Sequence, residues 1–295
     1  MRCPVEVLDL NLHGFAVNIF EPPKSDELFG AAVVLSGFSD GRLHPFATKL
    51  CSVLAKRGIL AVSFDPIGLW DSVRPGEKEK PELYEQGYYQ EQIRMVTAGT
   101  REIMGHRNSA GKLAVGGFCY GGYSALHNAA HNPDIDIVFA VSPTRDSIWS
   151  GPYLEELDTK WRVADDHMRS FTFYDRTGKP RFGLRALGQF FPGLVWPKFT
   201  REVPYSLVEN ERRYDLREIL PIIQQPALFI APTKDGLISP ESVHESFDTC
   251  GSTDKQLVQL PLNHDFFDNY RRTNLANNAV LTFLMQHMAR GLIAA

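Results

Sequence analysis

A cysteine between two glycines, near the middle of the chain, carries the residue types and spacing of a catalytic nucleophile. Cys119 lies in the run GFCYG (117–121), which follows the apolar run 112–115 and precedes a segment that predicts a helix. This pattern is typical of a nucleophile elbow, a sharp strand-to-helix turn that exposes its central side chain. Gly117 and Gly121 leave room for the strained backbone between them. A thiol at this position predicts covalent catalysis by a thiolate.

Two further residues complete a triad in the chain order that an elbow requires, namely nucleophile, acid and histidine. Asp235 follows the strand-like run 227–231, and His264 lies in the loop after the strand-like run 256–260. The carboxyl ends of parallel strands meet at one edge of a sheet, so we expect both residues to converge there with Cys119. His264 would accept the thiol proton, and Asp235 would orient the imidazole and stabilise its charged form.

A second carboxylate leaves the identity of the acid open. Asp146 also follows a strand-like run, which ends near residue 142. Asp235 is the preferred acid, because its turn and its spacing to His264 match the commoner arrangement. No metal site and no cofactor are predicted. His127 and His131 lie four apart on a predicted helix, but no third ligand is near them in the sequence.

Strand and helix patterns alternate along the chain and predict the scaffold that positions these residues. Residues 5–12 and 15–21 predict two antiparallel opening strands. Strands are then expected at 31–36, 59–64, 112–117, 135–142, 227–231 and 256–260, and helices at 44–57, 84–106, 121–131, 213–223, 239–249 and 269–291. Such alternation predicts an α/β fold with a mostly parallel central sheet and helices on both faces.

With these motifs the chain resembles the α/β-hydrolase superfamily, and its cysteine elbow resembles that of dienelactone hydrolases. The run 32–38 is similar to the family's strand and oxyanion loop, and the run 59–65 is similar to the strand that follows. The resemblance implies an α/β-hydrolase fold and an oxyanion hole built from the backbone N–H groups of Phe38 and Tyr120. Ser36 replaces the histidine that commonly opens this loop, a change that leaves the backbone donor intact.

A long insertion distinguishes the chain from the compact dienelactone hydrolases. The alternation stops over residues 143–212, which we expect to form an inserted cap, or lid, on a core made of residues 1–142 and 213–295. Within the cap, the turn-like run 175–178 predicts a hairpin that pairs 171–173 with 181–183. The candidate substrate-binding residues are Arg42, beyond the oxyanion loop, and four aromatic residues of the insertion, Trp149, Trp161, Phe190 and Trp196.

Composition limits the classes of partner. The 295 residues are 43% hydrophobic and carry a net charge of −4, without a basic stripe, so nucleic acid is not an expected partner. No apolar run approaches the roughly 20 residues that span a bilayer, and the first residues do not resemble a signal peptide. We therefore expect a cytoplasmic protein, and a reducing compartment suits a catalytic thiol. The sequence does not specify an oligomeric state.

These features predict a hydrolase that cleaves an ester, thioester or lactone through Cys119, His264 and Asp235, with an acyl-cysteine intermediate. The substrate would be a small molecule, either free or bound to a carrier. An acyltransferase or cyclase is the alternative, because an amine, a hydroxyl or an internal nucleophile can take the acyl group from the same thioester. A non-catalytic binding protein is a third hypothesis, and the ordered presence of all three triad residue types argues against it.

Overall fold

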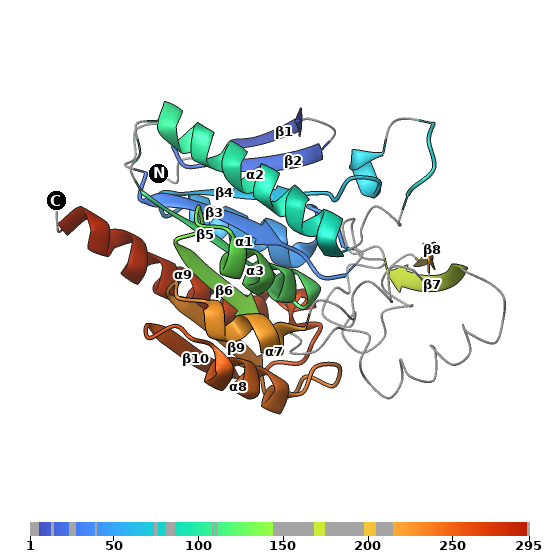
Figure 1. Ribbon diagram of the computed structural model, residues 1–295. Helices are drawn as coiled ribbons and strands as arrows, with labels where there is room; N and C mark the ends of the chain where they lie inside the picture. Colours follow the sequence, from blue (N-terminus) through green and yellow to red (C-terminus); the bar gives the residue numbers. More distant parts are fainter. Residues whose placement is uncertain are drawn as a thin grey trace.

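The computed structural model describes most of the core and part of the insertion. The described residues are 6–12, 15–23, 28–38, 40–73, 76–80, 86–107, 109, 111–143, 168–174, 198–204 and 215–293. An eight-stranded sheet crosses the centre of this described part (Figure 1). Its spatial order is β1 (Glu6–Leu12), β2 (Phe15–Glu21), β4 (Ile59–Phe64), β3 (Gly30–Leu35), β5 (Lys112–Phe118), β6 (Ile137–Val141), β9 (Ala227–Pro232) and β10 (Lys255–Leu260).

Strand directions confirm the predicted, mostly parallel sheet. β1 pairs antiparallel with β2, and β2 pairs antiparallel with β4. The remaining pairs, from β4 to β10, are parallel. All six parallel strands therefore end at the same edge, where β5 leads into Cys119.

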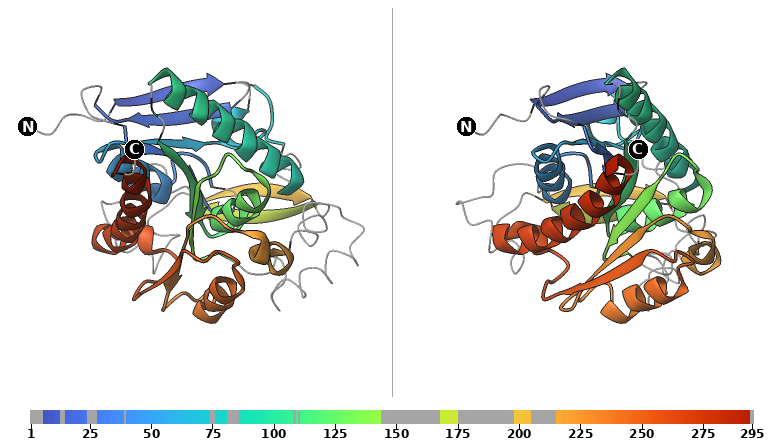
Figure 2. Two further views of the ribbon diagram at one scale, coloured as in Figure 1. Left: turned by 60° about the vertical axis from the view of Figure 1, so that its left-hand side comes forward. Right: turned by 90° about the vertical axis from the view of Figure 1, so that its left-hand side faces the viewer.

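Helices cover both faces of the sheet (Figure 2). α2 (Gln86–His106), α3 (Tyr120–His131) and α7 (Leu216–Ile219) pack together on one face, and α1 (Pro45–Ala55) and α9 (Tyr270–Ile293) pack on the other. α8 (Pro240–Thr249) lies against β9 and β10. Because both faces are covered, β3, β4, β6 and β9 are buried along their whole length, which accounts for their continuous apolar sequences.

Local signals begin and end these helices close to the predicted residues. The side chains of His44 and Ser239 cap α1 and α8, and a proline follows each cap as the first helical residue. The helix predicted over 213–223 is shorter than expected. It divides into α7 and the 3-10 turn η5 (Leu220–Ile222), because Pro221 has no backbone N–H with which to continue an α-helix.

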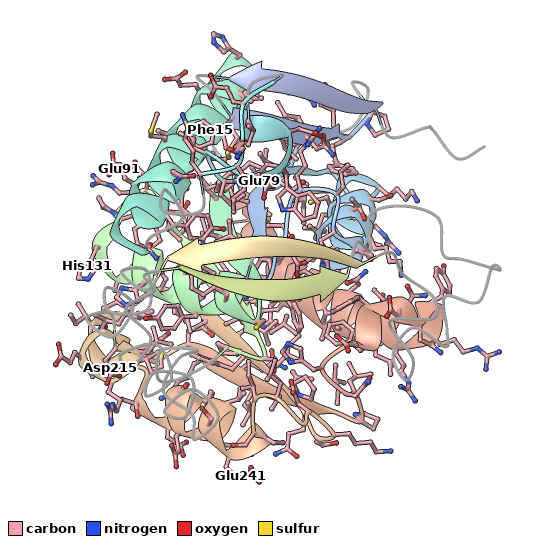
Figure 3. The ribbon with its side chains drawn as sticks, turned by 90° about the vertical axis from the view of Figure 1, so that its right-hand side faces the viewer. Phe15, Glu79, Glu91, His131, Asp215 and Glu241 are labelled. Atoms are coloured by element: carbon pink, nitrogen blue, oxygen red, sulfur yellow. The ribbon has the colours of Figure 1, made fainter. Side chains whose placement is uncertain are left out.

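The described part of the insertion is a two-stranded sheet. β7 (Met168–Tyr174) pairs antiparallel with β8 (Lys198–Pro204), in a register that runs from Met168 opposite Pro204 to Tyr174 opposite Lys198. The predicted partner of 171–173, the run 181–183, lies outside the described residues. The described partner, FTREV at 199–203, contains the strand-forming residues Phe, Thr and Val. β7 and β8 lie in front of the carboxyl edge of the main sheet (Figure 3).

Candidate active site

Cys119 occupies a strained turn between β5 and α3. Its φ of 54° and ψ of −119° lie in a region that residues other than glycine rarely adopt. Its N–H donates to the Val141 carbonyl at 2.9 Å, and its carbonyl accepts the Tyr123 N–H at 3.0 Å. The side chain sits at the N-terminus of a 12-residue helix, where the backbone dipoles favour negative charge. The predicted elbow geometry is thus present at Cys119.

Two glycines allow β3 to pass directly beside the elbow. A Cβ on Gly117 would lie 2.5 Å from the Leu35 carbonyl oxygen, and one on Gly121 would lie 2.4 Å from the Ser36 carbonyl oxygen. Gly116 faces β6 instead, where a Cβ would lie 2.3 Å from ring atoms of Phe139. These contacts are with backbone atoms or a packed ring, so side chains cannot be accommodated without moving a strand.

His264 and Asp235 meet at the same edge of the sheet. His264 Nδ1 lies 2.8 Å from Asp235 Oδ2. Asp235 Oδ1 accepts the N–H groups of Leu237 and Ile238, each at 2.9 Å, and Oδ2 also accepts the Ser142 hydroxyl at 2.5 Å. These hydrogen bonds hold a carboxylate that is almost fully buried, so its orientation toward the imidazole is well defined.

Charge couples His264 to both of its partners. Burial lowers the pKa of His264, but the negative charge of Cys119, hydrogen bonds to Asp235 and Cys119, and the charge of Asp235 outweigh it and raise the pKa to about 10. Burial also disfavours the charged form of Asp235, yet the hydrogen bond and charge of His264, with hydrogen bonds from Ile238 and Ser142, leave its pKa below the ordinary value. Both shifts favour the charged imidazolium of His264 beside the ionised carboxylate of Asp235.

An aromatic wall backs the imidazole. The rings of Phe118 and His264 lie with their centroids 4.7 Å apart, and Phe118 in turn meets Phe266 at 5.6 Å and Phe267 at 5.4 Å. Phe266 and Phe267 belong to the short 3-10 helix η6 (Phe266–Asp268), directly after His264. Packing against this cluster limits the rotation of the imidazole.

Phe38, in the loop after β3, and Tyr120, at the start of α3, carry the predicted oxyanion donors. Their rings meet edge to face, with centroids 5.4 Å apart, so the two residues are neighbours although they follow different strands. The Ser36 hydroxyl donates to the Gly41 carbonyl at 3.1 Å and folds the loop back on itself. The use of these two backbone N–H groups as an oxyanion hole stays a prediction.

Arg42 lies in a buried ion-pair network. Its Nη1 contacts Asp65 at 2.5 Å and Asp71 at 2.7 Å, and its Nε donates to Asn18 at 2.9 Å. The side chain is 4% exposed. These contacts favour a structural task for Arg42, namely to tie the oxyanion loop to β4 and η1 (Trp70–Ser72), and they leave little of the guanidinium surface for a substrate.

The other predicted site residues lie outside the described part of the chain. They are the alternative acid Asp146 and the four aromatic residues Trp149, Trp161, Phe190 and Trp196. Within the described part of the chain, no group of three His, Cys, Asp or Glu side chains clusters as metal ligands do, and no helix has the length and apolar character to cross a membrane.

The other two described thiols are buried and have different partners from Cys119. Cys51 and Cys250 are buried, and burial raises the pKa of both thiols. Neither has a described imidazole partner among its hydrogen bonds and charge interactions, in contrast to Cys119.

Ser142 was missed by the sequence analysis. It ends the predicted strand 135–142, and its hydroxyl reaches the carboxylate of Asp235. The available signal was its place directly after a buried strand, at the sheet edge where Cys119, Asp235 and His264 also lie. Serine is common in such turns, so this signal alone does not single it out.

Comparisons with known proteins identify the fold. No protein-family model matches the chain, and no curated protein matches it in sequence. The structure is similar to the α/β hydrolase GrgF from Penicillium sp. sh18, at 18% identity and a TM-score of 0.68, over 97% of this chain and 100% of that one.

Two lipases are also similar in structure. A soluble variant of the Saccharomyces cerevisiae monoglyceride lipase, in complex with a substrate analogue, matches at 15% identity and a TM-score of 0.71, over 96% of each chain. The Paleococcus ferrophilus monoacylglycerol lipase matches at 18% identity and a TM-score of 0.63, over 92% of this chain and 99% of that one. The chain therefore has the α/β-hydrolase fold.

Proposed function

We propose that this protein is a hydrolase of carboxylic esters, thioesters or lactones, with Cys119 as nucleophile, His264 as general acid and base, and Asp235 as the residue that orients His264. One observation carries the proposal. A strained cysteine at a helix N-terminus interacts with a partly buried imidazole, and that imidazole is hydrogen-bonded to a buried carboxylate at 2.8 Å. A purely structural cysteine needs neither the strain nor the partners.

Acylation would begin with the thiolate of Cys119. Its sulfur attacks the substrate carbonyl carbon, and the carbonyl electron pair moves onto the oxygen to give a tetrahedral intermediate. The backbone N–H groups of Phe38 and Tyr120 are the proposed donors to that oxygen. The intermediate collapses as the bond to the leaving group breaks, and imidazolium of His264 gives its proton to the departing oxygen or sulfur.

Deacylation would return the enzyme to its starting state. His264, now neutral, removes a proton from water, and the resulting hydroxide attacks the acyl-thioester carbonyl. The second tetrahedral intermediate expels the Cys119 thiolate and releases the carboxylic acid. Asp235 stays ionised throughout and stabilises each imidazolium that forms.

The similar structures support ester substrates within this class. Two of them are named as lipases of monoacylglycerols, and one of these contains a substrate analogue. At identities of 15 and 18%, the likeness extends to the fold, and a panel of substrates tests the acyl and alcohol parts.

Intact-mass spectrometry provides the direct test. We expect a short incubation with a panel of esters, thioesters and lactones to add the acyl mass to the wild-type protein, and the adduct to map to Cys119. Cys119→Ala should show no adduct and should lose turnover, whereas Cys250→Ala, which removes another buried thiol, should keep both. Turnover that survives in Cys119→Ala would exclude the proposal.

The identity of the acid has its own test. Asp235→Asn should lower kcat by about 10⁴-fold, because it changes the imidazole tautomer that the acid selects. Asp146→Asn should leave kcat within a few-fold of the wild type. A reversal of these two results would assign the role to Asp146.

A further inference from the structure

Ser142 lies at the end of β6, beside the carboxylate of Asp235. Its hydroxyl donates a 2.5 Å hydrogen bond to Asp235 Oδ2, the oxygen that also lies 2.8 Å from His264 Nδ1. We propose that Ser142 is a positioning residue of the active site, which holds the Asp235 carboxylate in the orientation that His264 requires. This inference rests on the proposed function, because it gives Ser142 a part in the same reaction.

The backbone of Ser142 is strained. Its φ is 50°, and its N–H donates to the Ile230 carbonyl at 2.9 Å. A non-glycine residue in this region costs on the order of 1–3 kcal/mol and persists only where its surroundings enforce it. Among the described residues other than glycine, Cys119 and Trp70 share a positive φ, and Cys119 is the proposed nucleophile.

The remaining contacts of the carboxylate explain why a hydroxyl is needed. Two backbone N–H groups, those of Leu237 and Ile238, hold Oδ1. Without Ser142, the imidazole would be the sole described donor to Oδ2, and the carboxylate could turn about its Cβ–Cγ bond as His264 changes charge. The Ser142 hydroxyl is buried, so water does not replace it readily. A short hydrogen bond to an ionised acceptor is among the stronger kinds.

The same hydrogen bond also favours the ionised form of the acid. Burial raises the pKa of Asp235, and the Ser142 hydrogen bond is one of the contacts that lower it, after the larger effects of His264 and the Ile238 N–H. The titratable groups that face this carboxylate are His264 directly and Cys119 on the far side of the imidazole. Loss of the Ser142 hydroxyl should therefore raise the pKa of Asp235.

Two substitutions separate the hydroxyl from the backbone strain. Ser142→Ala removes the hydroxyl and keeps the strain, whereas Ser142→Gly removes both, because glycine adopts a positive φ freely. We expect each to lower kcat roughly 10-fold or more with little change in KM, the size typical of one hydrogen bond to a charged group. Ser142→Gly should melt at a higher temperature than Ser142→Ala.

The pH dependence gives a readout that a merely structural role would not change. In Ser142→Gly, the acid limb of the kcat profile should move to higher pH, and ¹³C NMR of the Asp235 carboxyl should show the same upward movement without any substrate. Ser246→Ala is the matched control. Its hydroxyl is also fully buried, but it donates to the Ser242 carbonyl within α8, so both readouts should stay at wild-type values.

The outcomes distinguish this inference from the proposed function. If Cys119→Ala abolishes turnover while Ser142→Gly keeps the wild-type kcat and pH profile, Ser142 has no positioning role and the hydrolase proposal stands. If Cys119→Ala keeps turnover, the hydrolase proposal fails, and the Asp235 titration then decides whether Ser142 still governs that carboxylate. If Ser142→Ala does not fold, Ser142→Gly carries the test alone. A Ser142→Gly variant with an unchanged Asp235 titration would overturn the inference.

Discussion

At the scale of single residues, the candidate site couples the Cys119 thiol, the His264 imidazole and the Asp235 carboxylate. Interactions with Cys119 and Asp235 raise the pKa of His264, and the hydrogen bond and charge of His264 help to lower the pKa of Asp235. Burial makes these interactions stronger than they would be in water. The pKa of His264 therefore depends on its interactions with Cys119 and Asp235.

Removal of the Cys119 charge should lower the pKa of His264. That charge is the largest of the effects that raise this pKa to about 10, so Cys119→Ser, whose hydroxyl stays neutral, should bring the pKa down. NMR titration of the His264 ring protons measures it. Cys250→Ser, a buried thiol at the end of α8, is the control and should leave the titration unchanged. An unaltered pKa in Cys119→Ser would contradict the coupling of thiol and imidazole.

At the scale of elements, the approach of β3 to the elbow depends on missing side chains. A Cβ on Gly121 would lie 2.4 Å from a backbone oxygen of Ser36 and would push the oxyanion loop away from Cys119. The position of Cys119 therefore depends on the close packing of β3 against the end of β5.

Gly121→Ala should destabilise the protein by roughly 1–3 kcal/mol, because a strand end must move, and it should also reduce turnover. Gly99→Ala is the matched substitution in a different setting. It lies inside α2, where no atom comes within 4 Å of the new Cβ. It should stabilise by about 1 kcal/mol, from helix propensity alone. Urea unfolding compares the two, and equal effects would refute the close approach of β3.

The ion pairs of Arg42 form a second link between elements. Arg42 Nη1 contacts both Asp65, at the end of β4, and Asp71, in η1, but the Asp65 side chain is 2% exposed and that of Asp71 is 65% exposed. Burial raises the pKa of Asp65 in spite of the hydrogen bonds and charge of Arg42. Because Arg42 is itself buried, removal of Asp65 leaves its guanidinium poorly solvated.

Asp65→Ala should cost about 3–5 kcal/mol of stability, as expected when one partner of a buried ion pair is removed. Asp71→Ala should cost less than about 1 kcal/mol, because its charge is already solvated. Chemical denaturation at neutral pH measures both. Similar losses in the two variants would show that burial does not set the strength of this network.

At the scale of the whole molecule, the His264–Asp235 pair links stability to pH. The pKa of Asp235 is lowered from 3.8, so its contribution is complete above pH 3.8 and is lost as the pH falls through the lower value in the folded protein. The pKa of His264 is raised from 6.5 to about 10, so its contribution is complete below pH 6.5 and is lost as the pH rises through about 10.

Asp235→Asn should therefore be less stable than the wild type by about 1–3 kcal/mol between pH 4 and 6.5, the usual range for a hydrogen bond to a charged group. The difference should shrink as the pH rises from 6.5 through about 10, where His264 loses its charge. It should also shrink below pH 3.8. Unfolding free energies in urea at several pH values measure the difference, and a constant gap across this range would contradict the pair.

Much of the core could be predicted because its signals are local. The buried strands near 59–64 and 227–232 are continuous apolar runs, and the caps at His44 and Ser239 stand directly before prolines. The pairing of β7 with β8 could not be predicted in this way, since a partner further along the chain competes with the nearest turn-like run. Strand partners are chosen by contacts between distant residues, which single-sequence patterns do not contain.

The nucleophile elbow shows where the sequence suffices and where it does not. By itself, the sequence predicted the elbow at Cys119 and the alternation that yields a parallel sheet, because each depends on residues close together in the chain. The order of the three candidate triad residue types is read directly from the chain. Only the tertiary structure decided that His264 lies 2.8 Å from Asp235, that Ser142 shares the same carboxylate oxygen, and that Arg42 is held by ion pairs. Those relations join different strands, and their distances and burial arise only when the sheet brings the strand ends together.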